Sequence, residues 1–585
     1  MTEKFELYQS PEAPIPDETW AWNMYGAGVE NIGREGKPEL LPSPAPGVNQ
    51  LLVRVDAVGM CFSDVKLIKQ GGSHAKLYNR DLAADPTRLG HEATLTVMKV
   101  GEKLQDEFHP GQRLALQPDI YDELGRSTAY GYTIPGGLIQ FHLIGPEVLS
   151  AGLDQQTSYV LPVEGDLGYA AAALTEPWAC VEAAYTQRRR LEILDGGTIW
   201  IVGRADDATP YTFSAGLDKP AMIVLTDAPP AVKALVQAEA DRREVQVVES
   251  NRLRPETYET LRELTAGAGF DDIVMLDPRS AEAVSAAAKL IARRGTFNMV
   301  GETPLDGRPQ IDVGRMHYDY TAYLGNRGLD IAASYGEARN RCELRAGGTA
   351  VFVGAGGPMG QMHVQRAIEL PDGPTQIVAT EINAERLAIL EQQFTPLAEE
   401  NGKTLVAFNP SAPDASLYDL VQSLTAGAGA DDVVVSVPAA SVMAEAATLM
   451  KDDGMLVFFA GVRAGAYAPL DMSLVYLHNA QYTGTSGSTL ADQQLVVDKA
   501  LAGKLSPNRS VAAVGGIEAA AEGVAAMMEG RYAGKVVIFP QLSALPLMGL
   551  EELKAQYPSV GAALAPDGSW THEAEQRLIE TFWEV

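Results

Sequence analysis

The chain has 585 residues, of which 46% are hydrophobic and 21% charged, and its formal net charge is −30. This length exceeds what one hydrophobic core supports, so we expect about two to four domains of a soluble globular protein. The acidic balance argues against a nucleic-acid partner and against an anionic membrane surface, because both are bound through basic patches.

Cysteines are rare in this chain. Only Cys61, Cys180 and Cys342 are present, which is too few for a disulfide framework and indicates a reducing, cytoplasmic compartment. The N-terminus lacks a basic region followed by an apolar run, and no run of about 18 apolar residues occurs elsewhere. We therefore expect neither a signal peptide nor a membrane span.

Short strands are predicted in the first third of the chain. Residues 51–59 and 93–101 are apolar and partly alternating, and a turn followed by another strand is predicted at 110–116. Cys61 follows the first of these strands, and Gly90-His91-Glu92 directly precedes the second. This pattern predicts a compact β-rich domain with polar residues at its strand ends.

The pattern then changes to that of an α/β protein. Residues 170–194 favour a helix, and residues 197–203 form a short apolar run typical of a strand in a parallel sheet. Strand and helix patterns alternate from there to about residue 505, which predicts doubly wound structure.

The α/β half contains an internal repeat. Residues 196–203 (Gly-Gly-Thr to Val-Gly) have a counterpart at 347–354, and residues 264–272 reappear at 424–432 with one substitution. Because the matches occur in the same order at similar spacing, we interpret them as two tandem Rossmann-like units.

Side chains suited to a metal ion lie in the first third of the chain. Cys61, His91 and Glu176 offer a sulfur, a nitrogen and an oxygen ligand, and Glu92 adds a second carboxylate. Such a set suits a zinc ion that keeps one position open, and an open position lets the metal polarise an alcohol or a carbonyl. The alternative is a buried cysteine, a core histidine and surface carboxylates that never meet.

The second repeat carries a candidate nucleotide site. Gly354-Ala355-Gly356-Gly357-Pro358-Met359-Gly360 follows a predicted strand and precedes a predicted helix, where glycines let the backbone approach a pyrophosphate. Glu381 ends the next predicted strand, the position of an acid that binds the adenosine ribose hydroxyls. Its charge favours NAD over NADP. Asn383 is a further candidate for binding the cofactor, and the nearby Arg386 leaves room for NADP as the cofactor.

The first repeat lacks this glycine-rich segment. Arg204-Ala205-Asp206-Asp207 stands where the glycines would be, and acids oppose a pyrophosphate. Asp227 matches Glu381 in position. We expect a degenerate copy, kept as a scaffold or a dimer surface rather than as a second nucleotide site.

Taken together, the motifs resemble the zinc-dependent medium-chain dehydrogenase/reductase family, the alcohol and polyol dehydrogenases. Four segments carry the resemblance: Cys61-x-x-Asp64, Gly90-His91-Glu92, Glu176-Pro177-x-x-Cys180 and Gly534-Lys535-Val536-Val537. It extends from about residue 20 to residue 540, and the second Rossmann-like unit is the large departure from the family pattern.

The resemblance and the repeat together predict the fold class and the domains. We expect an α/β protein with a β-rich GroES-like catalytic domain and two tandem Rossmann-like doubly wound parallel-sheet units. The zinc-binding domain is expected at 1–190, completed by 506–540. The degenerate unit is expected at 191–335 and the NAD(P)-binding unit at 336–505. The aromatic and leucine content of the tail, 541–585, predicts docking onto the body or a sister subunit.

The family also implies roles for single residues. Cys61, His91 and Glu176 would bind one catalytic zinc, and Glu92 would exchange onto the metal or orient its ligands. The family's four-cysteine structural zinc lobe is excluded by the cysteine count. Cys180, four residues after Glu176, is a rival metal ligand, but we expect it to be a small packed side chain.

Three further residues, Ser63, Asp64 and Lys66, are expected to lie near the metal. Ser63 stands where the family places the hydroxyl that takes the alcohol proton, and Asp64 is expected to hydrogen-bond a ligand side chain. Lys66 replaces a histidine that often continues the relay, so it is either part of the proton exit or a solvated lysine.

The predicted function is hydride transfer between NAD(P) and a secondary alcohol, such as a polyol, a sugar or a sugar phosphate, or its ketone. Residues 176–182 and 357–360 are similar to sugar-phosphate members such as the L-sorbose-1-phosphate reductases. We expect a homo-oligomer. Two alternatives stay open: a zinc-free enone or quinone reductase of the same superfamily, and a non-catalytic NAD(H)-sensing binding protein.

Overall fold

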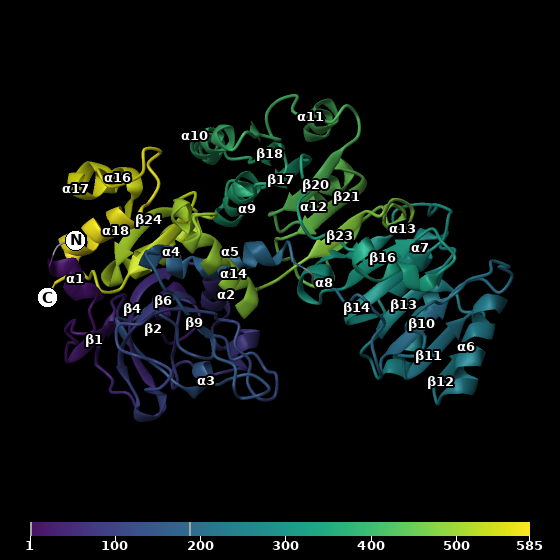
Figure 1. Cartoon of the computed structure of the whole chain (residues 1–585), viewed down its shortest axis with the longest axis horizontal. Helices are drawn as coiled ribbons and strands as arrows, with labels where there is room; N and C mark the ends of the chain where they lie inside the picture. Colours follow the sequence, from purple (N-terminus) through teal and green to yellow (C-terminus); the bar gives the residue numbers. More distant parts are fainter. Residues whose placement is uncertain (1–2, 187–188, 585) are drawn as a thin grey trace. The chain divides into compact units, whose positions relative to one another are not determined.

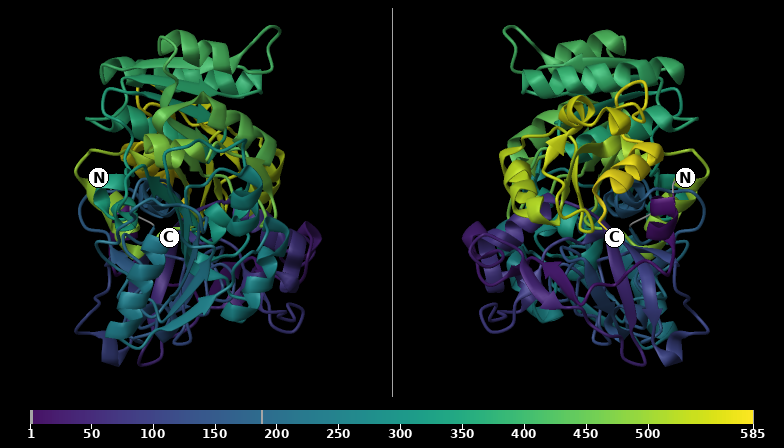
Figure 2. Two further views of the ribbon diagram at one scale, coloured as in Figure 1. Left: turned by 90° about the vertical axis from the view of Figure 1, so that its right-hand side faces the viewer. Right: turned by 90° about the vertical axis from the view of Figure 1, so that its left-hand side faces the viewer.

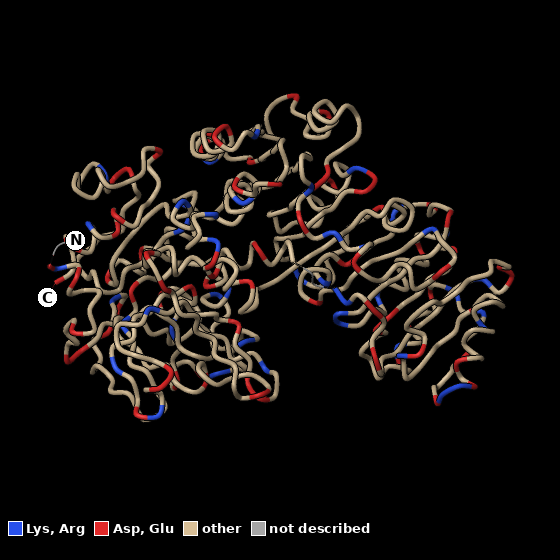
Figure 3. Tube along the Cα trace, viewed as in Figure 1, with Lys and Arg blue, Asp and Glu red and all other residues tan. Residues whose placement is uncertain are grey.

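The computed structural model describes residues 3–186 and 189–584, which divide into two compact units (Figure 1). The terminal unit comprises Met1–Ala183, Gly357–Met362 and Gly487–Val585, and the central unit comprises Ala184–Gly356 and His363–Ser486. Acidic and basic residues are interspersed along both units (Figure 3), so the net charge of −30 is not gathered in one segment.

A mostly antiparallel sheet forms the body of the terminal unit. Its strand order is β26-β24-β25-β4-β6-β7-β9, and β8 also pairs with β4. The strands are β26 (Met548–Gly549), β24 (Val511–Gly516), β25 (Lys535–Phe539), β4 (Leu51–Gly59), β6 (Glu92–Val100), β7 (Arg113–Leu116), β9 (Val160–Pro162) and β8 (Phe141–Ile144). Because β25 pairs with β4, the sheet brings a segment from the end of the chain beside the strand that precedes Cys61.

The predicted strands at 51–59 and 93–101 are confirmed as β4 and β6. The helix predicted over 170–194 is wrong in its second half, because α4 (Tyr169–Ala173) and α5 (Thr175–Ala183) are followed by irregular chain. Here Arg190 pairs with the buried Asp272, 3.2 Å away, instead of continuing the helix. Residues 187 and 188 lie outside the described residues.

The two ends of the chain pack together within the terminal unit (Figure 1, Figure 2). Helix α1 (Glu3–Gln9) contacts α18 (His572–Phe582), and the rings of Tyr8 and Trp583 meet edge to face at 5.0 Å. Helices α16 (Leu550–Gln556) and α17 (Pro558–Gly561) complete this cluster. The predicted docking of the tail onto the body is therefore confirmed.

The central unit contains two six-stranded parallel sheets with the same strand order. The first repeat has the order β12-β11-β10-β13-β14-β16, and the second has β19-β18-β17-β20-β21-β23. The first set is β12 (Gln246–Glu249), β11 (Met222–Thr226), β10 (Thr198–Val202), β13 (Phe270–Leu276), β14 (Ile291–Val300) and β16 (Ala322–Asn326). The second set is β19 (Thr404–Phe408), β18 (Gln376–Thr380), β17 (Thr349–Val353), β20 (Ala430–Val435), β21 (Met450–Phe458) and β23 (Gln481–Gly484). This is the Rossmann order, and the predicted α/β fold class with two tandem units is confirmed.

The repeats differ where a nucleotide phosphate site would begin. In the second repeat, β17 is followed by α9 (Pro358–Glu369). In the first repeat, residues 203–221 between β10 and β11 are all described and contain no helix. The first repeat therefore lacks the helix N-terminus that binds a pyrophosphate in this fold.

The two repeats share one hydrophobic core, which includes Met316 and Tyr323 of the first and Tyr476 and Tyr482 of the second. Strand β15 (Gln310–Asp312) of the first repeat pairs antiparallel with β22 (Tyr467–Pro469) of the second. Among residues 3–186 and 189–584, none of the helices combines the length and apolar character that crossing a bilayer requires.

Candidate metal centre and cofactor site

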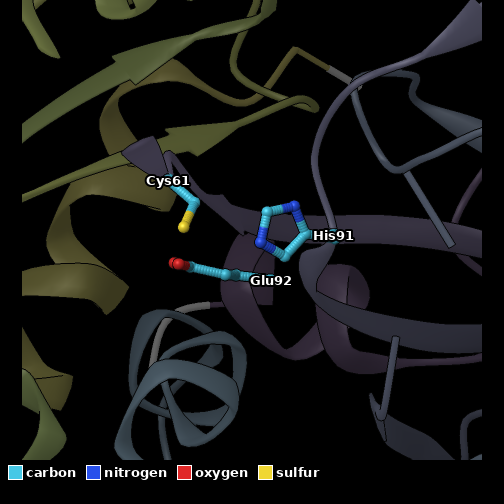
Figure 4. A group of neighbouring side chains, drawn as sticks. All are labelled: Cys61, His91 and Glu92. Carbon is cyan, nitrogen blue, oxygen red and sulfur yellow. The ribbon is translucent and has the colours of Figure 1, made fainter. Parts of the chain in front are cut away.

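Three potential ligands meet at one point of the terminal unit. Cys61 follows β4 and caps α2 (Phe62–Gln70), while His91 and Glu92 stand at the start of the adjacent strand β6. One ligand atom from each of the three residues lies within 4.8 Å of the others. Figure 4 shows their side chains turned toward a common region.

Asp64 and Ser63 hold the ligands in place. Asp64 Oδ1 lies 3.2 Å from His91 Nδ1, and since a carboxylate accepts, Nδ1–H donates and the Nε2 lone pair is left for a metal. Ser63 Oγ donates to Cys61 Sγ at 3.0 Å and lies 3.3 Å from His91 Nε2. Burial lowers the pKa of His91, but Asp64 and Cys61 outweigh it and raise this pKa well above its usual value.

Glu92 is a buried carboxylate with one unsatisfied oxygen. Its Oε1 accepts a hydrogen bond from Lys535 Nζ, which also donates to the Met60 carbonyl oxygen at 3.0 Å. Its Oε2 is buried and has no hydrogen-bond partner among the described residues. Such an atom is costly to bury, and a cation bound beside Cys61 and His91 would satisfy it. The sulfur, nitrogen and oxygen donors therefore fit a zinc ion.

Glu176 lies on α5, outside the closest group of ligand atoms. It is buried, and burial raises its pKa to about 7, with the charge of His91 lowering and that of Glu92 raising it. Cys180 Sγ lies 3.9 Å from Glu176 Oε1, and burial raises the pKa of this thiol well above its usual value.

The sequence reasoning missed several residues around this centre. Lys535 belongs to a motif that was recognised, but the pattern gave no sign of its pairing with Glu92. The Tyr132 ring lies 5.9 Å from the His91 ring and 5.2 Å from the His74 ring. Lys66 is exposed on α2, and its charge lowers the pKa of His74 after the larger effects of burial and of Lys76.

The glycine-rich turn of the second repeat has the backbone that its sequence suggests. Gly354 follows β17 with a φ of 78°, a conformation that favours glycine. A Cβ added to Gly356 would collide with the carboxylate of Glu381, which directly follows β18. Pro358, Met359 and Gly360 form the first turn of α9, and Gly357 has open space where a side chain would be.

Asn383 serves a local purpose. Its backbone N–H donates to Glu381 Oε1 at 2.9 Å, and its side chain accepts from Arg386 N at 3.0 Å, which caps α10 (Ala384–Glu400). The Asn383 side chain is thus used by the helix, while Glu381 Oε2 faces the glycine turn.

The equivalent position in the first repeat is filled by protein contacts. Asp207 accepts hydrogen bonds from Thr209 and from the Tyr211 hydroxyl, at 2.6–3.0 Å. Both carboxylate oxygens of Asp227 accept from Arg252 N, at 3.0 and 3.1 Å. These acids therefore close the loop at the end of the first sheet.

Comparison with known proteins agrees with this geometry. The family model described as "Alcohol dehydrogenase GroES-like domain" matches residues 47–148. The "Uncharacterized protein YggP" of Escherichia coli strain K12 is 30% identical over 300 residues, which cover 48% of this chain and 68% of that protein.

Two relatives are named for sugar-phosphate chemistry. Mannitol-1-phosphate 5-dehydrogenase of Aliivibrio fischeri is 26% identical and matches 61% of this chain and 86% of its own length. L-sorbose 1-phosphate reductase of Klebsiella pneumoniae is 27% identical and matches 53% of this chain and 75% of its own length.

Among solved structures, 2R,3R-butanediol dehydrogenase of Bacillus subtilis aligns with a TM-score of 0.50 and 15% identity, over 89% of this chain and 99% of that one. At this identity the likeness concerns the fold alone. The family match and the curated relatives carry the assignment: the chain belongs to the zinc-dependent medium-chain dehydrogenase/reductase family, the alcohol and polyol dehydrogenases, and is an oxidoreductase of that family.

Proposed function

We propose that the protein transfers a hydride between a secondary alcohol or its ketone and a nicotinamide dinucleotide, with the help of one zinc ion. The observation that carries this proposal is the group of Cys61, His91 and Glu92, in which one buried carboxylate oxygen has no hydrogen-bond partner among residues 3–186 and 189–584. A zinc-free reductase would have no use for such a group.

Cys61, His91 and Glu176 would hold the zinc, with Glu92 as an exchanging or orienting carboxylate. When bound, zinc supplies Lewis acidity that polarises the alcohol or carbonyl oxygen. Asp64 fixes the tautomer of His91 through the 3.2 Å contact to Nδ1. Lys535 keeps one oxygen of Glu92 paired while the other can turn to the metal.

Ser63 would take the proton of the alcohol. Its hydroxyl already contacts Cys61 Sγ and His91 Nε2, so it lies within reach of a group held between them. Lys66, exposed on the same helix, would pass the proton to solvent.

We propose that the second repeat binds the cofactor. Gly354, Gly356, Gly357 and the first turn of α9 would cradle the pyrophosphate, and Glu381 would bind the adenosine ribose. The carboxylate of Glu381 would repel a 2′-phosphate, which supports NAD over NADP.

We favour a polyol or sugar phosphate as the substrate. The support comes from the names of two relatives, mannitol-1-phosphate 5-dehydrogenase and L-sorbose 1-phosphate reductase, which match more than half of this chain.

Elemental analysis and a substrate screen test the proposal. We expect one zinc per chain, and we expect turnover of at least one polyol or sugar phosphate, followed by NADH absorbance. Cys61→Ala and His91→Ala should each lose the metal and nearly all turnover, while the control Cys342→Ala should keep both. About two zinc ions per chain, or full activity in either ligand variant, would refute the assignment.

A further inference from the structure

The loop that follows β21 in the second repeat is held by the first repeat. The Gly465 N–H donates to Asp312 Oδ2 at 2.8 Å, and the Val313 N–H donates to the Ala466 carbonyl oxygen at 3.0 Å. His317 Nδ1, on α8 (Val313–Tyr318), lies 3.2 Å from the Phe458 carbonyl oxygen. Because a carbonyl only accepts, His317 donates this bond from Nδ1.

Two glycines let α8 approach this loop closely. A Cβ added to Gly314 would collide with the Arg463 carbonyl oxygen, and one added to Gly461 would collide with the Tyr318 hydroxyl. The same added atom would lie 2.8 Å from His317 Nε2. The side chains of His317 and Tyr318 therefore border the backbone just beyond the carboxyl end of β21.

That position belongs to the half of the sheet that takes the second nucleotide. In a sheet of this order, each half binds one mononucleotide at the carboxyl ends of its strands. Glu381, after β18, marks the adenosine half. Strands β20, β21 and β23 form the other half, so the loop after β21 would border the nicotinamide of a cofactor bound to this sheet.

The contacts between the repeats are reciprocal. Tyr476, on α13 (Ser473–His478), donates its hydroxyl to the Thr303 carbonyl oxygen at 2.6 Å, in the loop after β14 of the first sheet. In the β15–β22 pair, Ile311 lies opposite Ala468, at the centre of three paired positions. The first sheet has no glycine-rich turn and no helix after β10, so only the contact made by α8 reaches a cofactor site.

We propose that the first repeat acts as a built-in partner whose residues His317 and Tyr318 position the nicotinamide end of the cofactor in the second repeat. This inference rests on the proposed binding of NAD by the second repeat. It gives the degenerate repeat a function: it fixes the loop after β21 within the same chain, and no second copy is required for that.

Binding of NAD+ and of ADP-ribose, which lacks the nicotinamide ring, tests this proposal by calorimetry on the full chain. His317→Ala and Tyr318→Phe should each weaken NAD+ about three- to tenfold, the loss expected for one hydrogen bond. Both should leave ADP-ribose within about twofold. The matched control is Tyr476→Phe, which removes the reciprocal contact to the first sheet and should change neither ligand.

The outcomes separate this proposal from the proposed function. If wild-type protein binds neither ligand, cofactor binding by the second repeat is wrong, and this inference is wrong with it. If wild-type protein binds both but the variants weaken NAD+ and ADP-ribose equally, or weaken neither, only the role of His317 and Tyr318 is refuted. Tyr318→Phe removes one hydroxyl from a side chain that is 39% exposed, so it tests the proposal even if His317→Ala does not fold.

Discussion

At the scale of single residues, Ser63 carries a hydroxyl that contacts two of the proposed zinc ligands. Its Oγ lies 3.0 Å from Cys61 Sγ and 3.3 Å from His91 Nε2. If it relays the alcohol proton, Ser63→Ala should lower kcat by roughly 10²- to 10⁴-fold while zinc and NAD stay bound. Ser73→Ala, at an exposed serine shortly after the same helix, is the control. An unchanged kcat, with a hydride isotope effect showing that chemistry limits the rate, would make Ser63 a packing residue.

His363 is buried, and its burial should make the stability of the folded protein depend on pH. It is fully buried, its ring lies 4.3 Å from the Phe459 ring, and Tyr185 Oη contacts its Nδ1 at 2.7 Å. Burial, with a smaller effect of Arg366, lowers the pKa of His363 to about 3. In the unfolded chain its pKa would be about 6.5.

Because the folded pKa is the lower one, the unfolded state takes up the proton first as pH falls. The stability linked to His363 is therefore present above about pH 6.5 and is lost as pH falls toward about 3. Between pH 7.5 and 5 the wild-type protein should lose about 2 kcal/mol more than His363→Phe. Urea unfolding at both pH values measures this loss. His109→Phe, at an exposed histidine, should keep the wild-type slope, and equal slopes in wild type and His363→Phe would contradict the prediction.

At the scale of elements, the C-terminal helix α18 caps the short helix that leads into α5. Glu575 is fully buried, and its two oxygens accept from Tyr169 N at 2.6 Å and Ala170 N at 2.8 Å. These are the first N–H groups of α4, which have no partner inside that helix. The tail thereby fixes the start of the segment that carries Glu176.

Glu575→Ala should therefore destabilise the terminal unit by about 2 kcal/mol, since it removes a charged cap from buried N–H groups. It should also speed the loss of zinc to a chelator, because α5 continues directly from α4. Urea unfolding and the rate of zinc release measure the two effects. Glu573→Ala, at an exposed position of the same helix, is the control, and equal effects of the two variants would refute the capping role.

Elements with a strong local pattern could be predicted from the sequence. Strands β4 and β6 are apolar runs bounded by glycine and polar residues, and their limits were found to within a residue. The end of α5 was missed, because the chain beyond Ala183 has helix-forming residues that are used instead for contacts such as Arg190 with Asp272.

The candidate site was only partly visible in the sequence, for a different reason. Cys61, His91 and Glu92 belong to two of the family's short segments, Cys61-x-x-Asp64 and Gly90-His91-Glu92, which could be recognised in the sequence. The pairing of Glu92 with Lys535 joins positions 443 residues apart, and no local pattern reports such a contact. The absence of a helix after β10 was likewise hidden, since the sequence showed only that acids replace the glycines.

At the scale of the whole molecule, the tandem repeats share one architecture but differ in the loops where a nucleotide would bind. Both sheets have the same strand order and pack into one core. The second keeps a glycine turn, a helix after its first strand and an acid beside the turn. In the first repeat, the carboxylates of Asp207 and Asp227 accept hydrogen bonds from other residues of the protein.

We therefore expect one NAD per chain and not two. A pyrophosphate needs free backbone N–H groups at a helix N-terminus, and residues 203–221 of the first repeat provide no helix. Calorimetry should give a stoichiometry near one NAD per chain. Glu381→Ala should weaken the binding of NAD and narrow its advantage over NADP. Gly356→Ala should weaken the binding of both cofactors, because its Cβ meets Glu381. Asp227→Ala, the control in the first repeat, should change little, since its carboxylate only holds Arg252 N. Two NAD sites per chain, or a loss of binding at Asp227 instead of Glu381, would move the cofactor to the first repeat.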